Sequence, residues 1–342
     1  MRLLLDEQGQ RAVLSGVETQ LTRNKLAEIL HKQDQDPTDP GSKSFGDLVK
    51  DGGEAFVRRW SESVLRFEKA LLDPGASLSK HQRYLRKLFL AQQLLPEGGV
   101  KPDLPLFIEG DPVVVGHTMP YIRNLRSFQD AAPSWSAEEA TQALLELHSY
   151  IERLHERGIL LGEVNWQNFG FDRDNNFVAF DTVNYDFPGF PCGTAFRETI
   201  DPKLLKQDET IAEKDAAALL RERPYSVYSD WFGFRCITLL VFTGCNPWSG
   251  KHKFENSRME LRRPRVRALR GLSLLHPNVR LTSPAIRRRP EVLSDSLYED
   301  LYRSFNGEIR SIFSKKLLSE MHWTICSVCG NEFASSQCPC AG

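Results

Sequence analysis

The feature that most constrains this chain is a polar loop between a long amphipathic helix and a short strand. Ser136-Ala-Glu-Glu139 is a capping box, which predicts the start of a helix. The apolar residues of that helix recur three or four positions apart: Ala140, Leu144, Leu147, Ile151 and Leu154. The helix is expected to end at Gly158, the polar loop covers 162–168, and 176–180 is strand-like. The polar side chains around this hairpin should therefore lie close together.

Three side chains of this region carry oxygen atoms suited to phosphoryl transfer: Glu163, Asn168 and Asp181. Metal ions that bridge phosphates prefer hard oxygen ligands, and an attacking hydroxyl needs a carboxylate to position it. The three residues are therefore candidate catalytic residues. The alternative for Asn168 and Asp181 is that they cap the loop.

The stretch Leu154-His-Glu-Arg-Gly-Ile-Leu-Leu-Gly-Glu-Val-Asn-Trp-Gln-Asn168 resembles the catalytic loop of protein kinases, in which an aspartate precedes an asparagine by five positions. Glu163 and Asn168 have the same spacing. Asp181 falls where the family has its magnesium-binding aspartate, although Thr182-Val183 replaces the usual Phe-Gly.

Other segments resemble the family in the expected order. Upstream, 116–122 resembles the hinge, so Met119 and Tyr121 are candidate nucleotide contacts. Downstream, 192–196 and 201–204 resemble the peptide-binding segment. The segment 229–234 resembles the family's buried helix, and 246–250 completes the order. Asp230 resembles the aspartate of a buried helix that braces the catalytic loop, and we expect it to have this role.

The chain is most similar to a bacterial group of kinase-like proteins that carry a zinc ribbon after the kinase lobe. The resemblance implies a bilobal α+β fold with a small β-rich N-lobe containing a helical insertion (1–122), a helical C-lobe (123–320) and a zinc ribbon (321–342). It implies a phosphotransferase that uses ATP and Mg²⁺ (or Mn²⁺) to modify Ser or Thr of a protein substrate. The alternative is a pseudokinase, a nucleotide-binding or scaffolding module that has lost transfer.

One departure from the family concerns the catalytic base. Glu163 stands where the family has an aspartate, and its extra methylene moves the carboxylate by about a bond length. A misplacement of ~1 Å can cost on the order of a hundredfold in rate.

A second departure concerns the lysine that binds the nucleotide phosphates, for which two alignments are open. In the first, 26–30 resembles the lysine strand, but Glu28 occupies the lysine position, where a carboxylate would repel phosphate. In the second, 51–57 is the glycine-rich loop and 64–66 belongs to the lysine strand. We rank the second lower because the apolar residues of 54–73 recur every three or four positions, which predicts a helix.

A second helix is predicted over 79–95, and it contains no acidic residue. The carboxylate that pairs with the family's lysine would therefore come from Glu54, Glu62 or Glu68. The other predicted elements are a small meander over 1–30, a linker over 33–44, strands over 104–122, an apolar helix over 230–242 that ends at Gly244, and a helical pattern over 294–318 with Ser294 as N-cap.

Four of the seven cysteines lie in the last seventeen residues, which fits metal ligation better than a disulfide framework. These four, here called the cysteine knuckle, are Cys326, Cys329, Cys338 and Cys340. Four thiolates suit tetrahedral Zn²⁺, with His322 as a substitute ligand; reduced thiols or a disulfide are the alternatives. Cys192, Cys236 and Cys245 are expected to be buried or half-buried side chains.

The formal net charge is −1, but Lys and Arg are concentrated in 251–290. The runs 262–267 and 287–289 could contact the phosphates of nucleic acid, which would suit a zinc-ribbon adaptor. Aromatic residues are sparse there, so we do not expect nucleic-acid binding.

The composition, 41% hydrophobic and 26% charged, is typical of a folded globular protein. The first residues contain no apolar core of signal-peptide length, and the longest apolar run, 236–242, is far shorter than the ~20 residues that span a bilayer. We therefore expect a cytoplasmic protein without a membrane partner.

Overall fold

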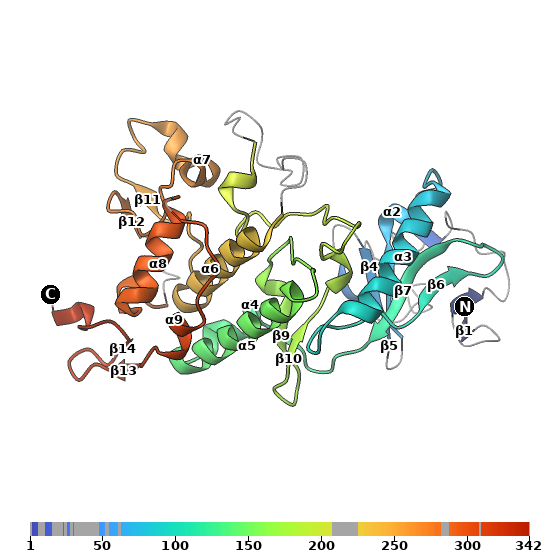
Figure 1. Ribbon diagram of the computed structural model, residues 1–342, viewed down its shortest axis with the longest axis horizontal. Coiled ribbons are helices and arrows are strands. Elements are labelled where there is room, and N and C mark those ends of the chain that lie inside the picture. The colour runs from blue at the N-terminus through green and yellow to red at the C-terminus, as the bar shows by residue number, and fades with distance from the viewer. Residues whose placement is uncertain are drawn as a thin grey trace. The chain divides into compact units, whose positions relative to one another are not determined.

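The structure, a computed structural model, describes residues 2–5, 11–15, 23, 26–27, 30, 48–51, 55–60, 63–206, 225–281, 287–307 and 309–341. Its internal contacts divide the chain into two compact units, Met1–Arg123 (unit 1) and Asn124–Gly342 (unit 2). Both units combine helices with small sheets (Figure 1), so the chain has the predicted α+β character.

Unit 1 contains a seven-stranded sheet with the order β1-β2-β6-β7-β5-β4-β3. Its strands are β1 (Arg2–Leu5), β2 (Ala12–Ser15), β3 (Leu48–Asp51), β4 (Ala55–Trp60), β5 (Ser63–Glu68), β6 (Pro105–Ile108) and β7 (Val114–Pro120). β2 and β6 are parallel, and the other neighbours are antiparallel. Two helices, α2 (Lys69–Leu72) and α3 (Leu78–Leu94), follow β5, and α3 packs against β7.

Several predicted elements of unit 1 are confirmed. The antiparallel pair β1 and β2 forms the first part of the predicted meander, α3 is the predicted second helix, and β6 and β7 are the strands expected over 104–122. The sheet buries Phe56, Leu65, Phe67, Leu106 and Val115 in one apolar cluster.

The predicted helix over 54–73 is wrong, because 55–60 and 63–68 form the antiparallel strands β4 and β5. Phe56 faces Phe67 across this pair of strands, and both are buried. The helical period in the sequence arose because buried residues of two separate strands were counted as one series. Only the last turn of that stretch, α2, is helical, and it ends at Asp73 before Pro74-Gly75 as predicted.

The alignment that placed the family's lysine strand over 26–30 is also wrong, because Leu26, Ala27 and Leu30 are helical. Leu26 and Leu30 are fully buried, one helical turn apart. Glu28, the predicted linker 33–44, and the candidate partners Glu54 and Glu62 lie outside the described residues.

Unit 2 is mainly helical around α5 and α6 (Figure 1). Its helices are α4 (Phe128–Ala131), α5 (Ala137–His155), α6 (Val227–Thr243), α7 (Pro264–Leu269), α8 (Asp295–Phe305) and α9 (Lys316–Ser319). Its strands are β8 (Arg126–Ser127), β9 (Phe169–Phe171), β10 (Phe177–Ala179), β11 (Lys251–His252), β12 (Val279–Arg280), β13 (Thr324–Ile325) and β14 (Glu332–Phe333). Short 3-10 turns are η2 (Ala132–Ser134), η3 (Trp166–Asn168), η4 (Thr182–Asn184), η5 (Pro202–Leu204), η7 (Met259–Arg262), η8 (Pro290–Val292) and η9 (Pro339–Ala341).

The long helix α5 begins with the predicted capping box. The Ser136 hydroxyl accepts a hydrogen bond from the Glu139 backbone N–H at 3.1 Å, and the Glu139 carboxylate accepts one from the Ser136 N–H at 2.7 Å. α6 begins three residues before its predicted start. Ser226 and Ser229 form a second capping box there, which was not predicted from the sequence. It ends at Gly244 as predicted, and nearly all of its side chains are buried.

The helical pattern predicted over 294–318 is confirmed only at its two ends. Ser294 is the N-cap of α8, as predicted. The helix then stops after Phe305, and Gly307 adopts a left-handed conformation that a helix interior excludes. The next helix, α9, begins at Lys316. Among the described residues, no helix has the length and apolar character needed to cross a bilayer.

Candidate functional site

The polar loop in unit 2 is fixed in position by Asp230 of α6. Its carboxylate accepts backbone hydrogen bonds from Leu161 (2.7 Å) and Gly162 (3.0 Å), and it lies 2.9 Å from Nε2 of His155 at the end of α5. Asp230 is fully buried. A buried carboxylate needs such partners to offset its desolvation, so this contact confirms the predicted brace.

Two glycines allow the loop to lie tightly against its neighbours. Gly162 has a φ of 68°, and a Cβ there would lie 2.7 Å from Cβ of Cys192. A Cβ on Gly233 of α6 would lie 2.6 Å from Cβ of Val164. Larger residues at either position would therefore push the loop away from the segments that hold it.

The second half of the loop is held by side-chain bonds to its backbone. The Asn165 side chain accepts a hydrogen bond from the Gln167 N–H at 3.0 Å and caps η3, which contains Asn168. The Thr199 hydroxyl donates to the Val164 carbonyl. The loop therefore depends on residues far away in the sequence, which contact it from two sides.

Asn168 and Asp181 are brought together at the base of the β9–β10 hairpin. The Phe180 N–H, next to Asp181, donates to the Asn168 carbonyl at 2.9 Å. Asp181 has a φ of 60°, which is uncommon for a residue other than glycine. Its carboxylate accepts a hydrogen bond from the Asn184 amide at 3.3 Å. Two hard oxygen donors on adjacent strand ends are the kind of ligand set that Mg²⁺ or Mn²⁺ prefers.

Glu163 lies at the start of the polar loop and is half-buried. It is close to Tyr225, whose hydroxyl donates to the Thr194 carbonyl. Burial raises the pKa of Tyr225, and the charges of Cys192 and Glu163 raise it further. Tyr225 therefore stays a neutral phenol beside the Glu163 carboxylate.

The two candidate nucleotide contacts from the hinge belong to unit 1. Met119 is in β7 and pairs with Val64 of β5. Tyr121 follows β7, and the Arg59 guanidinium lies 4.1 Å from the centre of its ring, a cation–π contact.

Unit 1 contains a buried ion pair that was not predicted from the sequence. Arg66 of β5 donates through Nε to the Glu68 carboxylate at 2.6 Å, and both side chains are almost fully buried. The second lysine alignment covered this strand, and Glu68 was one of the candidate partners. The signal was present in Arg66-Phe-Glu68, where alternate residues of a strand face the same side.

Tyr84 of α3 extends this ion pair to His117 of β7. The Tyr84 hydroxyl donates to Glu68 at 3.0 Å and lies 2.7 Å from Nδ1 of His117. A carboxylate can only accept, so the Tyr84 proton points to Glu68 and Nδ1–H of His117 donates to the Tyr84 oxygen. Burial, with the Arg66 charge as a second cause, holds the pKa of His117 well below its usual range. His117 is therefore a neutral structural residue.

The cysteine knuckle gathers all four predicted thiols. The sulfur atoms of Cys326, Cys329, Cys338 and Cys340 lie within 4.8 Å of one another, and His322 is not part of the cluster. The Cys326–Cys340 and Cys329–Cys338 distances are 3.5 and 3.6 Å. Tetrahedral Zn–S bonds of about 2.3 Å would place sulfurs about 3.8 Å apart, whereas a disulfide needs about 2 Å. The donor set thus fits a metal ion such as zinc and excludes a disulfide in this state.

The backbone of the knuckle also prepares it for a cation. N–H groups of Cys329 and Val328 lower the pKa of Cys326 to about 6. Hydrogen bonds of the protonated Cys340 thiol with the neighbouring sulfurs raise the pKa of Cys340 to about 12. Four thiolates repel one another unless a cation lies between them, so the cluster is arranged for a metal rather than for free thiolates. Cys192, Cys236 and Cys245 are buried, as predicted.

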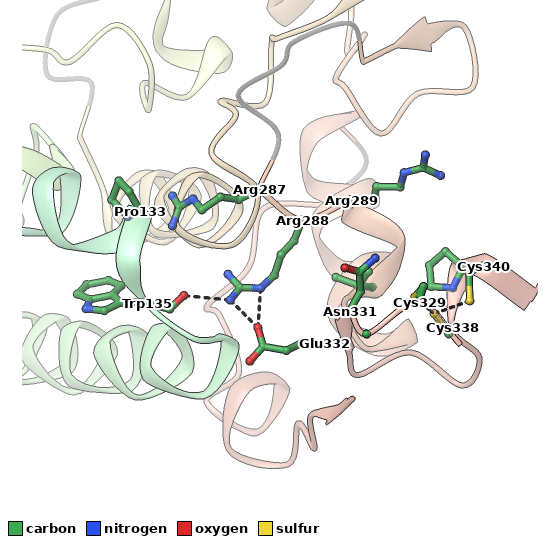
Figure 2. Close-up of a pocket in the computed structure, with 13 residues that line it drawn as sticks. Pro133, Trp135, Arg287, Arg288, Arg289, Cys329, Asn331, Glu332, Cys338 and Cys340 are labelled. Atoms are coloured by element: carbon green, nitrogen blue, oxygen red, sulfur yellow. Dashed lines mark hydrogen bonds and ion pairs between the residues drawn. The ribbon is translucent and has the colours of Figure 1, made fainter. Parts of the chain in front are cut away.

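The knuckle is attached to the start of α5. The Glu332 carboxylate accepts from the Ala137 N–H (3.1 Å) and pairs with Arg288 at 2.6 Å (Figure 2). Trp323 donates through Nε1 to the Thr141 hydroxyl at 2.9 Å. These contacts connect the knuckle to the helix that leads into the polar loop.

Much of the basic segment is structural rather than free to bind a partner. Arg265 is buried and donates to the Lys206 carbonyl at 3.0 Å. Arg267 is buried and donates to the carbonyls of Gly250 (2.7 Å) and Trp248. Guanidiniums used in this way cannot contact nucleic acid, so two of the predicted candidates for that role are excluded.

No family model matches the chain, and no curated protein is significantly similar to it. The kinase-like interpretation therefore depends on the motifs and on the geometry described above.

Proposed function

We propose that this chain is a protein-kinase-like phosphotransferase that moves the γ-phosphate of ATP to a Ser or Thr hydroxyl of a protein. The observation that carries the proposal is the arrangement of Asn168 and Asp181 beside a loop held by the buried Asp230. This order of helix, braced polar loop and hairpin with a terminal aspartate is typical of a kinase catalytic lobe.

The residues have distinct proposed roles. Asn168 and Asp181 would hold Mg²⁺ or Mn²⁺, and Glu163 would orient the acceptor hydroxyl. Bound ATP with its metal supplies the phosphoryl group and the charge that offsets the phosphates. Met119 and Tyr121 would contact the nucleotide. The cysteine knuckle would hold Zn²⁺ in a structural role.

Arg66 is the residue that we propose in place of the family's lysine. In protein kinases that lysine lies on the third strand and pairs with a glutamate of the following helix. Arg66 lies on β5, the third strand of the β3-β4-β5 run, and pairs instead with Glu68 of its own strand. An arginine keeps its charge when buried and can donate to phosphate oxygens in a fork.

The second candidate is a pseudokinase that binds nucleotide without transferring phosphate. Two departures favour it: the longer Glu163 at the position of the base, and Thr182-Val183 after Asp181. Misplacing the carboxylate would slow transfer while leaving the metal ligands in place.

A thermal-shift titration with ATP and Mg²⁺ tests nucleotide binding. A ligand at a hundred times its Kd stabilises the folded state by about 2.7 kcal/mol, so the wild type should melt several degrees higher. Asp181→Ala should lose this shift. Asp174→Ala, an exposed acidic residue of the same hairpin, should keep it. Absence of any shift in the wild type would refute both the enzyme and the nucleotide-binding pseudokinase.

Transfer of labelled phosphate to the chain itself or to an added acceptor protein then separates the two candidates. The enzyme predicts incorporation by the wild type that Glu163→Ala abolishes. A nucleotide-dependent thermal shift without incorporation would establish the pseudokinase.

A further inference from the structure

Unit 2 contains a cavity of about 800 Å³ between the segment Arg287–Arg289 and the cysteine knuckle. Pro133 and Trp135 line one side of it, three cysteines of the knuckle line the other, and Glu332 lies between them, paired with Arg288 (Figure 2). Three consecutive arginines therefore line this one hollow. No role in the proposed phosphotransfer uses it.

The three arginines differ in their partners. Arg288 is neutralised by Glu332 at 2.6 Å and donates to the Trp135 carbonyl at 3.0 Å. Arg287 and Arg289 have no ion-pair partner among the residues that the structure describes. Figure 2 shows Arg287 pointing towards Pro133 and Arg289 pointing in the opposite direction, towards the side of the knuckle.

Arg287 and Arg288 place two neighbouring cations beside one carboxylate, Glu332, so the charge of Arg287 is not balanced. Arg287 is half-buried, and its pKa is lowered by burial and then by the charge of Arg288. The Nη1 groups of both residues are enclosed by protein and have no hydrogen-bond partner among the described residues. Buried N–H groups without acceptors are costly, and two neighbouring guanidiniums repel each other. An anion at this place would relieve both costs.

We propose that this cavity binds a phosphate monoester through the guanidinium groups of Arg287 and Arg288. A tetrahedral dianion offers three oxygens, which guanidinium forks bind with paired hydrogen bonds. The site does not depend on the proposed phosphotransfer activity.

The position of the charges favours a compact phosphate over a nucleic-acid strand. Nucleic-acid phosphates are regularly spaced and are contacted by cations spread along a surface. Here Arg287 and Arg288 lie together in a hollow with one carboxylate between them, whereas Arg265 and Arg267 of the basic segment are buried and bonded to carbonyls. The thiolates of the knuckle are anionic and would repel phosphate from the side of Arg289, so Arg287 should dominate binding.

The cavity offers a matched pair of variants. Arg287→Gln removes the half-buried cation, and Arg289→Gln removes an exposed one that lines the same cavity. Isothermal titration of the full chain would use inorganic phosphate, a short phosphoserine peptide and the same peptide without phosphate. Zinc content and melting temperature of each variant would show that it is folded.

We expect the wild type to bind both phosphate probes and not the unphosphorylated peptide. Arg287→Gln should weaken binding at least tenfold, and Arg289→Gln should change it less than about threefold. Tighter binding of the peptide than of free phosphate would identify a phosphoprotein ligand, and equal binding would identify phosphate itself. No binding of either probe, or equal binding by wild type and Arg287→Gln, would overturn the proposal. Tight binding of a single-stranded oligonucleotide that both variants weaken alike would replace it with nucleic-acid binding.

Discussion

The polar loop and the cysteine knuckle of unit 2 are both predicted ligand sites, but they are built in opposite ways. The loop is held by Asp230 and Thr199, which lie far from it in the sequence and are buried. The knuckle draws all its ligands from 326–340, and three of its four cysteines are not buried. The loop can therefore keep its geometry without a ligand, whereas the knuckle has little core and should need its metal to stay folded.

The difference also affects what each site reveals about its ligand. Four converging thiols define the chemistry of the knuckle without any knowledge of a family. A braced loop with one amide and two carboxylates fits several kinds of chemistry, and the motif order is what favours phosphoryl transfer. Cys329→Ser and Asp230→Asn each change one member of this pair and leave the other intact.

The largest effect is expected for the knuckle. Cys329→Ser should reduce bound zinc from one ion per chain to less than a tenth, because a structural zinc site needs its four ligands. Metal content would be measured by mass spectrometry after purification under reducing conditions. Cys245→Ser, which changes a buried cysteine outside the knuckle, should keep its zinc. Full zinc content in Cys329→Ser would show that the knuckle is not the metal site.

Removing the brace should have the next largest effect. Leu161 and Gly162 donate to different oxygens of Asp230, so in Asp230→Asn one of these buried N–H groups would face the new NH₂ group, and both groups would lack an acceptor. Each such group costs about 1–3 kcal/mol, and we expect a loss of about 3 kcal/mol in the free energy of unfolding. Urea denaturation would measure it, with the exposed Asp174→Asn as a control that changes stability by less than about 0.5 kcal/mol. A similarly small change in Asp230→Asn would mean that the loop does not depend on its brace.

Unit 1 should show a pH dependence that comes from His117. Its pKa in the folded protein lies well below the unfolded value of 6.5, so the unfolded chain takes up a proton first as the pH falls. The stability that a neutral His117 provides is complete above pH 6.5 and decreases below it, by up to about 1.4 kcal/mol per pH unit. Denaturation at pH 7.5, 6.5 and 5.5 should show this slope, and His117→Gln should reduce it. An unchanged slope in the variant would contradict the neutral, buried state.

The contact between the knuckle and α5 should contribute least. Glu332→Gln removes the charge that pairs with Arg288 and weakens the acceptor for the Ala137 N–H. Both side chains are partly exposed, so the expected loss is only about 1 kcal/mol, with zinc content unchanged. A thermal melt with parallel metal analysis would measure it. Loss of zinc in this variant would mean that metal binding by the knuckle depends on its contact with α5.

The sequence predicted best where one local pattern decides the structure. The capping box at Ser136 and Glu139 fixed the start of α5, and the left-handed residue Gly244 fixed the end of α6. The close spacing of four cysteines was enough to predict the knuckle. In each case the deciding groups lie within one turn or one short loop of each other.

Prediction failed where contacts across the fold decide. The series Phe56, Val64 and Phe67 has a helical spacing only because its members come from two strands, β4 and β5. The same error gave a low rank to the strand that carries Arg66, so its ion pair with Glu68 was missed. The stop of α8 at Phe305 is a different case, because it depends on the nearby Gly307, which the apolar pattern of 294–318 concealed.

Binding of Mn²⁺, followed by electron paramagnetic resonance with and without ATP, tests the account most directly. The wild type, already loaded with zinc, should bind Mn²⁺ tightly only when ATP is present. Asp181→Asn should lose at least about tenfold in that affinity and keep one zinc ion per chain. The proposal that Asn168 and Asp181 form a nucleotide-metal site would be contradicted by either of two results. The wild type would show no ATP-dependent Mn²⁺ binding, or Asp181→Asn would bind Mn²⁺ as strongly as the wild type.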